Sequence, residues 1–141
     1  MSDINIGALT EVINNKADKD LKNVDINSGA DAVIEYQVPT ADNDYTGYRK
    51  YASGYVEIWG TKTGMSQREY VGSITLPITM ADTRYACFVS AWSNRGTDID
   101  WNFTGGCTPK TTTKFSFSLY GLGTTDLVTG MSWSVKGMAA A

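Results

Sequence analysis

The sequence predicts a mostly β protein, an antiparallel β-sandwich-like domain with a short helix before it. From Ala32 onward, apolar and polar residues alternate with a period of two in about seven short stretches, which Gly, Asn, Asp or Thr turns separate. No helical pattern stands between these stretches, which favours an antiparallel sandwich or barrel over βαβ units. The composition agrees, because 14 glycines and 8 tyrosines stand against only 3 prolines.

Each predicted strand is defined by a stripe of apolar residues. The stripes are Ile34, Tyr36 and Val38; residues 55–59; Ile74, Leu76 and Ile78; Tyr85, Cys87, Val89 and Ala91; Trp101 and Phe103; Phe115, Phe117 and Leu119; and Met131, Trp133 and Val135. We assign these residues to the core or a subunit interface: Tyr51, Tyr55, Trp59 and the stripe that begins at Ile74.

One hairpin can be predicted in register. The turn signal of residues 52–54 places Arg49 and Lys50 across from Glu57 on the following strand. An exposed cross-strand ion pair of this kind contributes only about 0.2–1 kcal/mol.

The first part of the chain differs from the rest. It lacks aromatic residues, and its apolar residues recur at helical spacing from Ile6 to Ile13, which predicts a short amphipathic helix over residues 6–18. Such a helix is not stable alone, so it either lies on its own domain or joins several chains as a coiled-coil neck. We therefore divide the chain into a neck over residues 1–27 and a β-sandwich domain over residues 28–141.

Charge and composition exclude several functions. The 141 residues carry a net charge of −3 and include no histidine, which removes Ser/His and Cys/His catalytic pairs and the usual zinc ligand sets. The acidic balance, with a pI near 4.8, argues against nucleic-acid binding. The start shows no secretory signal and no stretch approaches the ~20 apolar residues of a membrane span, so we expect cytoplasmic synthesis without membrane insertion. Whether Met1 is the native start stays open.

Aromatic residues beside turns are the best candidates for binding. An aromatic ring stacks on the apolar face of a sugar, and neighbouring amide, carboxylate and guanidinium groups bind its hydroxyls. Residues 92–98 combine all of these groups, and the glycine-rich loop of residues 121–126 could reach the same end of the domain. The candidate receptor-binding residues are Trp92, Asn94, Arg95, Asp98, Asp100, Trp101, Tyr120 and Asp126, with Tyr45 and Tyr48 as further aromatic residues beside turns.

Catalysis and metal binding are weaker alternatives. A glycan-cleaving enzyme needs two carboxylates across a cleft, and Asp98 and Asp100 could supply one while Glu57, Glu69 or Asp126 supplied the other. Acidic residues beside turns are usually solvated turn formers. Asp98, Asp100 and Asn102 also resemble the start of a calcium loop, but they lack its glycine and terminal glutamate. We therefore expect no enzyme activity, no bound metal and no cofactor.

Two stretches resemble phage tail fibres. Residues 8–24, ALTEVINNKADKDLKNV, look like the neck that precedes a tail-fibre tip, and residues 48–60, YRKYASGYVEIWG, resemble the first strand of the C-terminal tip domain. Residues 74–85, ITLPITMADTRY, the Lys114–Phe117 strand and Trp133 follow in the expected order. Ile58 stands where glutamine is usual, and residues 87–130 match no pattern of the family.

The resemblance implies a function for the chain. Tail-fibre tips are homotrimeric, have a β-sandwich-like fold, bind a bacterial surface receptor and have no enzyme activity. We therefore expect a tail-fibre tip of a phage or phage-like particle, joined to the rest of the fibre, assembled in the host cytoplasm and carried on the virion. Its receptor would be a surface glycan or an outer-surface protein. The alternatives are an assembly cap that binds nothing and, less favoured, a glycan-cleaving tip.

The two cysteines give a further test of register. If the strand of Cys87 and Val89 pairs with that of Phe103 through a loop near residue 97, Cys87 faces Cys107 and Val89 faces Gly105. The two sulfur atoms should then be neighbours. Cytoplasmic synthesis favours free thiols over a disulfide.

Overall fold

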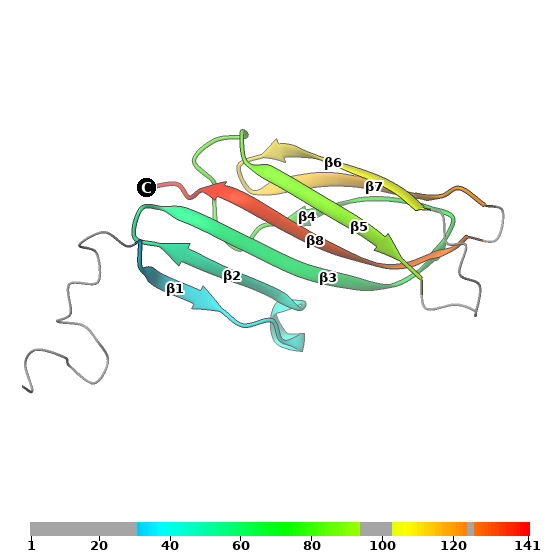
Figure 1. The fold of residues 1–141 in the computed structure, drawn as a ribbon, viewed down its shortest axis with the longest axis horizontal. Helices are drawn as coiled ribbons and strands as arrows, with labels where there is room; N and C mark the ends of the chain where they lie inside the picture. The colour runs from blue at the N-terminus through cyan, green and yellow to red at the C-terminus, as the bar shows by residue number, and fades with distance from the viewer. Residues whose placement is uncertain (1–30, 94–102, 124–125) are drawn as a thin grey trace, which may run out of the picture. The chain divides into compact units, whose positions relative to one another are not determined.

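The computed structural model describes residues 31–93, 103–123 and 126–141, which form two packed antiparallel β-sheets (Figure 1). The mostly β, antiparallel fold predicted from the sequence is confirmed. The predicted helix and neck lie outside the described residues. The strands are β1 (Val33–Gln37), β2 (Thr46–Tyr51), β3 (Tyr55–Gln67), β4 (Glu69–Thr75), β5 (Ala86–Trp92), β6 (Phe103–Thr111), β7 (Lys114–Gly121) and β8 (Val128–Met138), and a 3₁₀ turn, η1 (Ala41–Asn43), joins β1 to β2.

The two sheets differ in size. The larger, which we call sheet A, has the strand order β1-β2-β3-β8-β5, and the smaller, sheet B, has the order β4-β7-β6. The long strands β3 and β8 pair along sheet A from Tyr55 opposite Met138 to Gln67 opposite Val128. Because sheet A has two strands more than sheet B, β1 and β2 extend beyond the covering layer, and their main contacts are with each other and with β3.

The hydrophobic core lies between the sheets and follows the period of two. On β8, Met131, Trp133 and Val135 are buried between the layers, whereas Ser132 and Lys136 face outward. The stripes predicted on β7 and β8 form strands whose apolar residues belong to the core. The buried apolar residues are Val56, Ile58, Met65, Leu76, Met80, Tyr85, Phe115, Phe117, Leu119, Val128, Met131, Trp133 and Val135.

The first predicted stripe forms a strand but not part of the core. The exposed fractions of Ile34, Tyr36 and Val38 are 61%, 71% and 61%. These residues do belong to the region of β1, but β1 is the edge strand of the part of sheet A that sheet B does not cover. Alternation predicts a strand without saying whether a second layer packs on it.

Every tryptophan among the described residues lies over a glycine of the neighbouring strand. The pairs are Gly47 with Trp59 between β2 and β3, Gly60 with Trp133 between β3 and β8, and Gly130 with Trp92 between β8 and β5. A Cβ atom added at Gly60 would lie 2.6 Å from the Trp133 ring. An aromatic ring that covers a cross-strand glycine fixes the register, because a slip by one residue would put a side chain under the ring.

The predicted hairpin at residues 52–54 is confirmed. Arg49 lies opposite Glu57 in the β2–β3 ladder, whereas Lys50 lies opposite Val56 and so faces the other side of the sheet. Gly54 has a φ of 91°, a left-handed conformation that glycine adopts without a steric cost. The guanidinium of Arg49 also lies 5.5 Å from the centre of the Trp59 ring, a cation–π contact on the same face.

The predicted pairing of the two cysteine strands is wrong. β5 pairs with β8, where Cys87 lies opposite Val135, and β6 pairs with β7, where Cys107 lies opposite Phe117. β5 and β6 therefore belong to different sheets. The sulfur atoms are nevertheless neighbours, because the two thiols hydrogen-bond to each other across the sandwich. Both cysteines are free.

The sandwich has one closed edge and one open edge. At the closed edge β5 of sheet A lies against β6 of sheet B, and Tyr85, just before β5, ties the layers together. Its hydroxyl lies 2.6 Å from the carbonyl oxygen of Lys114 and 2.9 Å from that of Thr111, which bracket the β6–β7 turn. Burial, together with the nearby Cys87, raises the pKa of Tyr85. At the open edge, β1 and β2 have no opposing strand of sheet B among the described residues.

The tryptophan–glycine pairs can be tested by two matched substitutions. Gly60→Ala should lower the free energy of unfolding by about 1–3 kcal/mol, because the buried Trp133 ring must move to make room. Gly106→Ala on β6 is the control, because an added Cβ atom there has no neighbour within 4 Å, and its effect should stay within about 0.5 kcal/mol. Urea denaturation of both variants measures the difference. Equal effects would mean that the ring over Gly60 does not limit the space.

Candidate functional site

The candidate binding residues that the structure describes gather at one end of the sandwich. The ladders place Gln67 opposite Val128, Trp92 opposite Gly130, and Phe103 opposite Gly121. The end of β3, the end of β5, the start of β6 and the β7–β8 connection therefore lie together, on the right in Figure 1. We call this the loop end. The predicted convergence of the Trp92 and Gly121 segments is confirmed.

The opposite end, which we call the base, holds both ends of the described chain. Val33 lies opposite Tyr51, next to the hairpin turn at Gly54. The backbone N–H of Ala139 donates to the carbonyl oxygen of that same Gly54, 2.8 Å away. Figure 1 shows the C-terminus at this end, on the left. The described chain thus starts and finishes at the base, and the loop end is the far end of the sandwich.

Trp92, the last residue of β5, lies at the loop end on the outer face of sheet A. Its indole packs on Gly130, and a Cβ atom at Gly130 would collide with the ring. Its carbonyl oxygen accepts a hydrogen bond from the Thr129 hydroxyl at 3.5 Å. The side chain is half-buried. Trp92 is therefore a half-buried residue of the outer face, neither a core tryptophan nor a free loop residue.

An arginine that the sequence did not single out organises the loop end. Arg68, in the β3–β4 turn, donates from Nε to the carbonyl oxygen of Gly121 at 2.9 Å and from Nη2 to that of Leu122 at 3.2 Å. Its guanidinium lies 4.9 Å from the centre of the Tyr120 ring, and its own carbonyl accepts from the Gly121 N–H at 2.7 Å. Arg68 thus holds Tyr120 and the start of the β7–β8 loop in place.

Asp126 forms hydrogen bonds to Gly123 within the β7–β8 loop. Its carboxylate accepts a hydrogen bond from the Gly123 N–H at 2.7 Å, and its own N–H donates to the Gly123 carbonyl at 3.2 Å. A carboxylate that already accepts a backbone N–H closes a turn and has less capacity left for a ligand. The structure therefore places Asp126 at the predicted end in a positioning role. Of the glycine-rich loop, Gly121 and Leu122 are held by Arg68, and Gly123 is held by Asp126.

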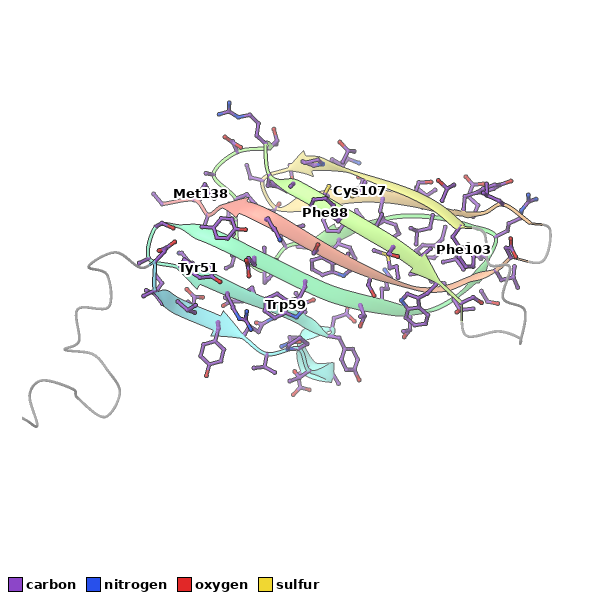
Figure 2. The ribbon with its side chains drawn as sticks, in the orientation of Figure 1. Tyr51, Trp59, Phe88, Phe103, Cys107 and Met138 are labelled. Carbon is purple, nitrogen blue, oxygen red and sulfur yellow. The ribbon has the colours of Figure 1, made fainter. Side chains whose placement is uncertain are left out.

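The remaining predicted binding residues lie in a segment that the structure does not describe. Asn94, Arg95, Asp98, Asp100 and Trp101 lie outside the described residues, as does Asn102 of the calcium-loop alternative. Ser93 and Phe103, which flank them in the chain, lie at the loop end. Figure 2 labels Phe103 there.

Each pair of carboxylates weighed for catalysis includes Asp98 or Asp100, which lie outside the described residues. Glu57 lies on the outer face of sheet A, beside Arg49 and Lys136, and Glu69 lies opposite Tyr120 on the outer face of sheet B. In the part of the chain that the structure covers, there is no cluster of three or more Cys, Asp or Glu residues that could hold a metal ion. That part also contains no helix long and apolar enough to cross a membrane.

A polar groove at the open edge is a second concave surface. It has a volume of about 430 Å³ and lies between the overhanging strands β1 and β2 and the strand β4. An adjoining hollow of about 450 Å³ shares Asp44, Thr61 and Lys62 with it and adds Tyr45. The groove is lined by Gln37, Asn43, Asp44, Thr46, Thr61, Lys62, Ser73, Ile74, Thr75, Leu76, Pro77 and Trp133.

The wall of this groove is a strained turn. Asp44 and Tyr45 are two successive non-glycine residues with left-handed φ angles of 55° and 53°. Asn43 holds the turn: its Oδ1 accepts from the N–H of Thr40 at 2.8 Å and of Thr46 at 3.1 Å, and its Nδ2 donates to a backbone carbonyl. Such conformations cost free energy and persist where the surroundings impose them, often at binding sites. Tyr45 is 53% exposed at the mouth of the groove.

Tyr48, the other aromatic residue named beside a turn, has a local partner. Its hydroxyl donates to Glu35 Oε1 at 2.6 Å, and this hydrogen bond raises the pKa of Tyr48. Nearby, Gln37 Nε2 donates to the carbonyl oxygen of Thr46 at 2.7 Å. The inner face of the overhang is thus a hydrogen-bonded polar surface, which explains why it stays uncovered.

Comparison with known proteins identifies the fold. No protein-family model matches the chain, and no curated protein matches it by sequence. Solved structures do match. An N-truncated R1-type pyocin tail fibre superimposes with a TM-score of 0.53 at 13% identity, over 96% of this chain and 98% of that one. The chain has the fold of a pyocin tail fibre.

Two further tail-fibre structures agree. An N-truncated R2-type pyocin tail fibre gives a TM-score of 0.50 at 18% identity, over 96% of this chain and 43% of that one. The C-terminal part of the R1 pyocin fibre of P. aeruginosa gives 0.51 at 14% identity, over 65% of this chain. The match spans only 26% of that longer fibre chain. The predicted resemblance to tail-fibre C-terminal domains is therefore confirmed for the fold.

The role of Arg68 can be tested by amide exchange. Arg68→Ala removes two charge-assisted hydrogen bonds, each worth roughly 1–2 kcal/mol, so the Gly123 amide should exchange at least about fivefold faster. Arg84→Ala is the matched control, because Arg84 lies near the base, where its exposed guanidinium pairs with Asp82 at 3.1 Å. Hydrogen exchange followed by NMR distinguishes the two. If Gly123 exchanges at the wild-type rate in Arg68→Ala, the arginine does not hold the loop.

Proposed function

We propose that this chain is the receptor-binding tip of a tail fibre from a phage or a phage-like particle, and that its loop end attaches the particle to a bacterial surface. The observation that carries the proposal is the polarity of the sandwich. Both ends of the described chain lie at the base, and the candidate binding residues lie at the opposite end. A fibre that continues from the base would present the loop end to the cell. The fold shared with pyocin tail fibres supports this role.

The chemistry of the loop end suits a surface glycan or an outer-surface protein. The half-buried Trp92 ring lies on the outer face of sheet A, and Tyr120 is held by Arg68 on the outer face of sheet B. Aromatic rings held in this way stack on sugar rings or on apolar side chains at a small entropic cost. The neighbouring Asn94, Arg95, Asp98, Asp100 and Trp101 would add polar contacts.

The polar groove is a second candidate for the same receptor. The observation that favours it is the pair of strained residues, Asp44 and Tyr45, at its mouth. A hollow of a few hundred Å³ with hydroxyl and amide groups and an exposed aromatic ring fits one or two sugar residues. Attachment through the groove would be lateral and would not require the loop end.

Self-association is the second part of the proposal. The outer face of sheet A carries aromatic and apolar side chains on all five strands, among them Tyr36 at 71%, Phe88 at 56% and Met138 at 48% exposure (Figure 2). Antiparallel sheets usually turn a polar face to water, and an apolar patch of this kind normally marks an interface. We propose that two further copies of this chain cover this face in a homotrimer, as the tail-fibre resemblance implies.

The row of charges across the same face favours a copy of this chain over an unrelated partner. Arg49, Glu57 and Lys136 lie opposite one another on β2, β3 and β8, so the charge alternates in sign across the sheet. A face that carries both signs can pair with another copy of itself. Tyr51, Tyr55 and Trp59 flank this row and are half-buried, which fits their earlier assignment to an interface.

The trimer can be tested by matched substitutions on the two outer faces. Phe88→Glu should reduce the mass in light scattering from about three times 15.3 kDa to 15.3 kDa while preserving the β spectrum in circular dichroism. A buried unpaired carboxylate at an interface costs several kcal/mol, which is enough to dissociate it at micromolar concentration. Val71→Glu is the control, because Val71 is 66% exposed on the outer face of sheet B. A wild-type monomer would refute the assembly, and a trimeric Phe88→Glu would refute this interface.

Receptor attachment can be tested with tyrosine variants at the two candidate surfaces. Tyr120→Ala at the loop end should weaken binding to cells of a susceptible strain by about tenfold or more, as loss of an aromatic contact does. Tyr45→Ala in the groove serves as its control. Trp92→Ala should act like Tyr120→Ala and lower stability by less than the about 3–5 kcal/mol of a core tryptophan.

The outcomes separate the candidate functions. Loss only in Tyr45→Ala would move the receptor to the groove, and wild-type protein that binds no susceptible cells would favour a pure assembly cap. Release of oligosaccharide from host polysaccharide would favour a glycan-cleaving tip.

A further inference from the structure

Cys87 and Cys107 meet across the closed edge of the sandwich. Cys87 belongs to β5 in sheet A and Cys107 to β6 in sheet B, and their thiols hydrogen-bond to each other. Both are half-buried against the core. The two strands come close, because a Cβ atom at Gly105 would lie 3.6 Å from Val89 Cγ2. Two thiols from different layers are thus held in contact.

We propose that this pair is an oxidation site at which a small-molecule disulfide, such as oxidised glutathione, converts the two thiols into a Cys87–Cys107 disulfide that joins sheet A to sheet B. Two observations favour this pair as partners. The sulfur atoms are already neighbours, and β5 and β6 are in contact two residues away on each strand, where a Cβ atom at Gly105 would touch Val89. Glycines at positions 105 and 106 leave the backbone of β6 free to make the remaining small adjustment.

The reaction proceeds by two thiol–disulfide exchanges. The Cys107 thiolate attacks one sulfur of glutathione disulfide, which forms a mixed disulfide and releases one glutathione thiolate. The Cys87 thiolate then attacks the Cys107 sulfur of that mixed disulfide, which forms the protein disulfide and releases the second glutathione. The two cysteines lose two electrons and two protons in total, and the glutathione disulfide takes them up as two glutathione thiols.

The acidity of Cys87 decides the order of these steps. Cys107 is half-buried on the inner face of sheet B, opposite Phe117 in the edge strand β6. Cys87 is less reactive: burial, followed by the hydrogen bond from its thiol to Cys107, raises its pKa to about 12. Tyr85 and Cys107 are the titratable groups that face it, and Lys136 of the adjacent strand lies on the other face of sheet A. Below its pKa, the thiolate fraction of Cys87 rises tenfold per pH unit, so closure should be faster at alkaline pH.

The bond should form after the protein leaves a reducing compartment. Glutathione and thioredoxin keep cytosolic thiols reduced, whereas released particles meet oxidising surroundings. The disulfide would close a loop of about 20 residues and fasten the edge where the two sheets meet. It would form whether or not the loop end binds a receptor, so it is independent of the proposed attachment.

To test the proposal, the full-length wild-type protein is incubated with glutathione disulfide at mildly alkaline pH. After denaturation, thiol titration should fall from two thiols per chain to none, and the intact mass should fall by two hydrogens without a glutathione adduct. Peptide mapping should recover Cys87 linked to Cys107. The midpoint of thermal unfolding should rise by about 10 °C and return with dithiothreitol, as expected for a loop of this length.

Single variants supply the control. Cys87→Ser should stop at a stable glutathione adduct on Cys107, with no rise in the midpoint, because no second thiol can resolve the mixed disulfide. Cys87→Ala repeats this test if serine disturbs the core. Two thiols that persist in the oxidised wild type, a lasting glutathione adduct, or covalent links between chains would each overturn the proposal.

Discussion

The register of sheet A depends on the packing of three tryptophans on three glycines. Each of the three ladders between β2, β3, β8 and β5 contains one such pair, and the rings alternate between faces. Trp133 lies in the core over Gly60, whereas Trp59 and Trp92 lie on the outer face. A ring covers a glycine only in one register, so these contacts fix which residues face sheet B. The core, the outer face and the loop end all follow from this alignment.

Unequal sheet sizes then determine where binding surfaces can form. Sheet B covers β3, β8 and β5, and the inner face of these strands is apolar. The inner face of β1 and β2, which sheet B does not cover, carries Gln37, Thr46 and Tyr48. Gln37 and Tyr48 form hydrogen bonds within this region. The polar groove is the space left at this open edge. At the closed edge, Tyr85 and the cysteine pair join the layers. The open edge is therefore accessible to a ligand, whereas contacts between the two sheets hold the closed edge together.

The sequence predicted which residues form strands better than it predicted which strands pair with each other. Alternation identified the strands β7 and β8 with their apolar faces, and the turn at Gly54 aligned Arg49 with Glu57. It could not say that β1 lies beyond the second layer, or that β5 and β6 belong to different sheets, because a period of two describes one strand and not its partner. Cys87 and Cys107 were predicted as neighbours within a sheet and are neighbours between sheets.

The same limit applies to the candidate site. Proximity to turns was enough to bring Trp92, Tyr120 and Asp126 to one end. Arg68 was missed because its partners, Gly121 and Leu122, lie 53 and 54 residues away in the chain. The groove depends on left-handed backbone at Tyr45, a residue whose type gives no signal for that conformation. Contacts that need tertiary register, or strain that tertiary packing imposes, leave little trace in a single sequence.

The position of Trp92 would connect the proposed assembly with the proposed attachment. Its ring lies on the same outer face as Phe88 and Trp59, at the border of that face with the loop end. One side of the ring packs on Gly130, so only the other side can meet a partner chain or a receptor. In a trimer joined through the outer faces, the three copies of this tryptophan would lie where the subunit interfaces reach the far end of the fibre. A receptor bound there would contact more than one subunit, and the affinity of the tip would then depend on its assembly.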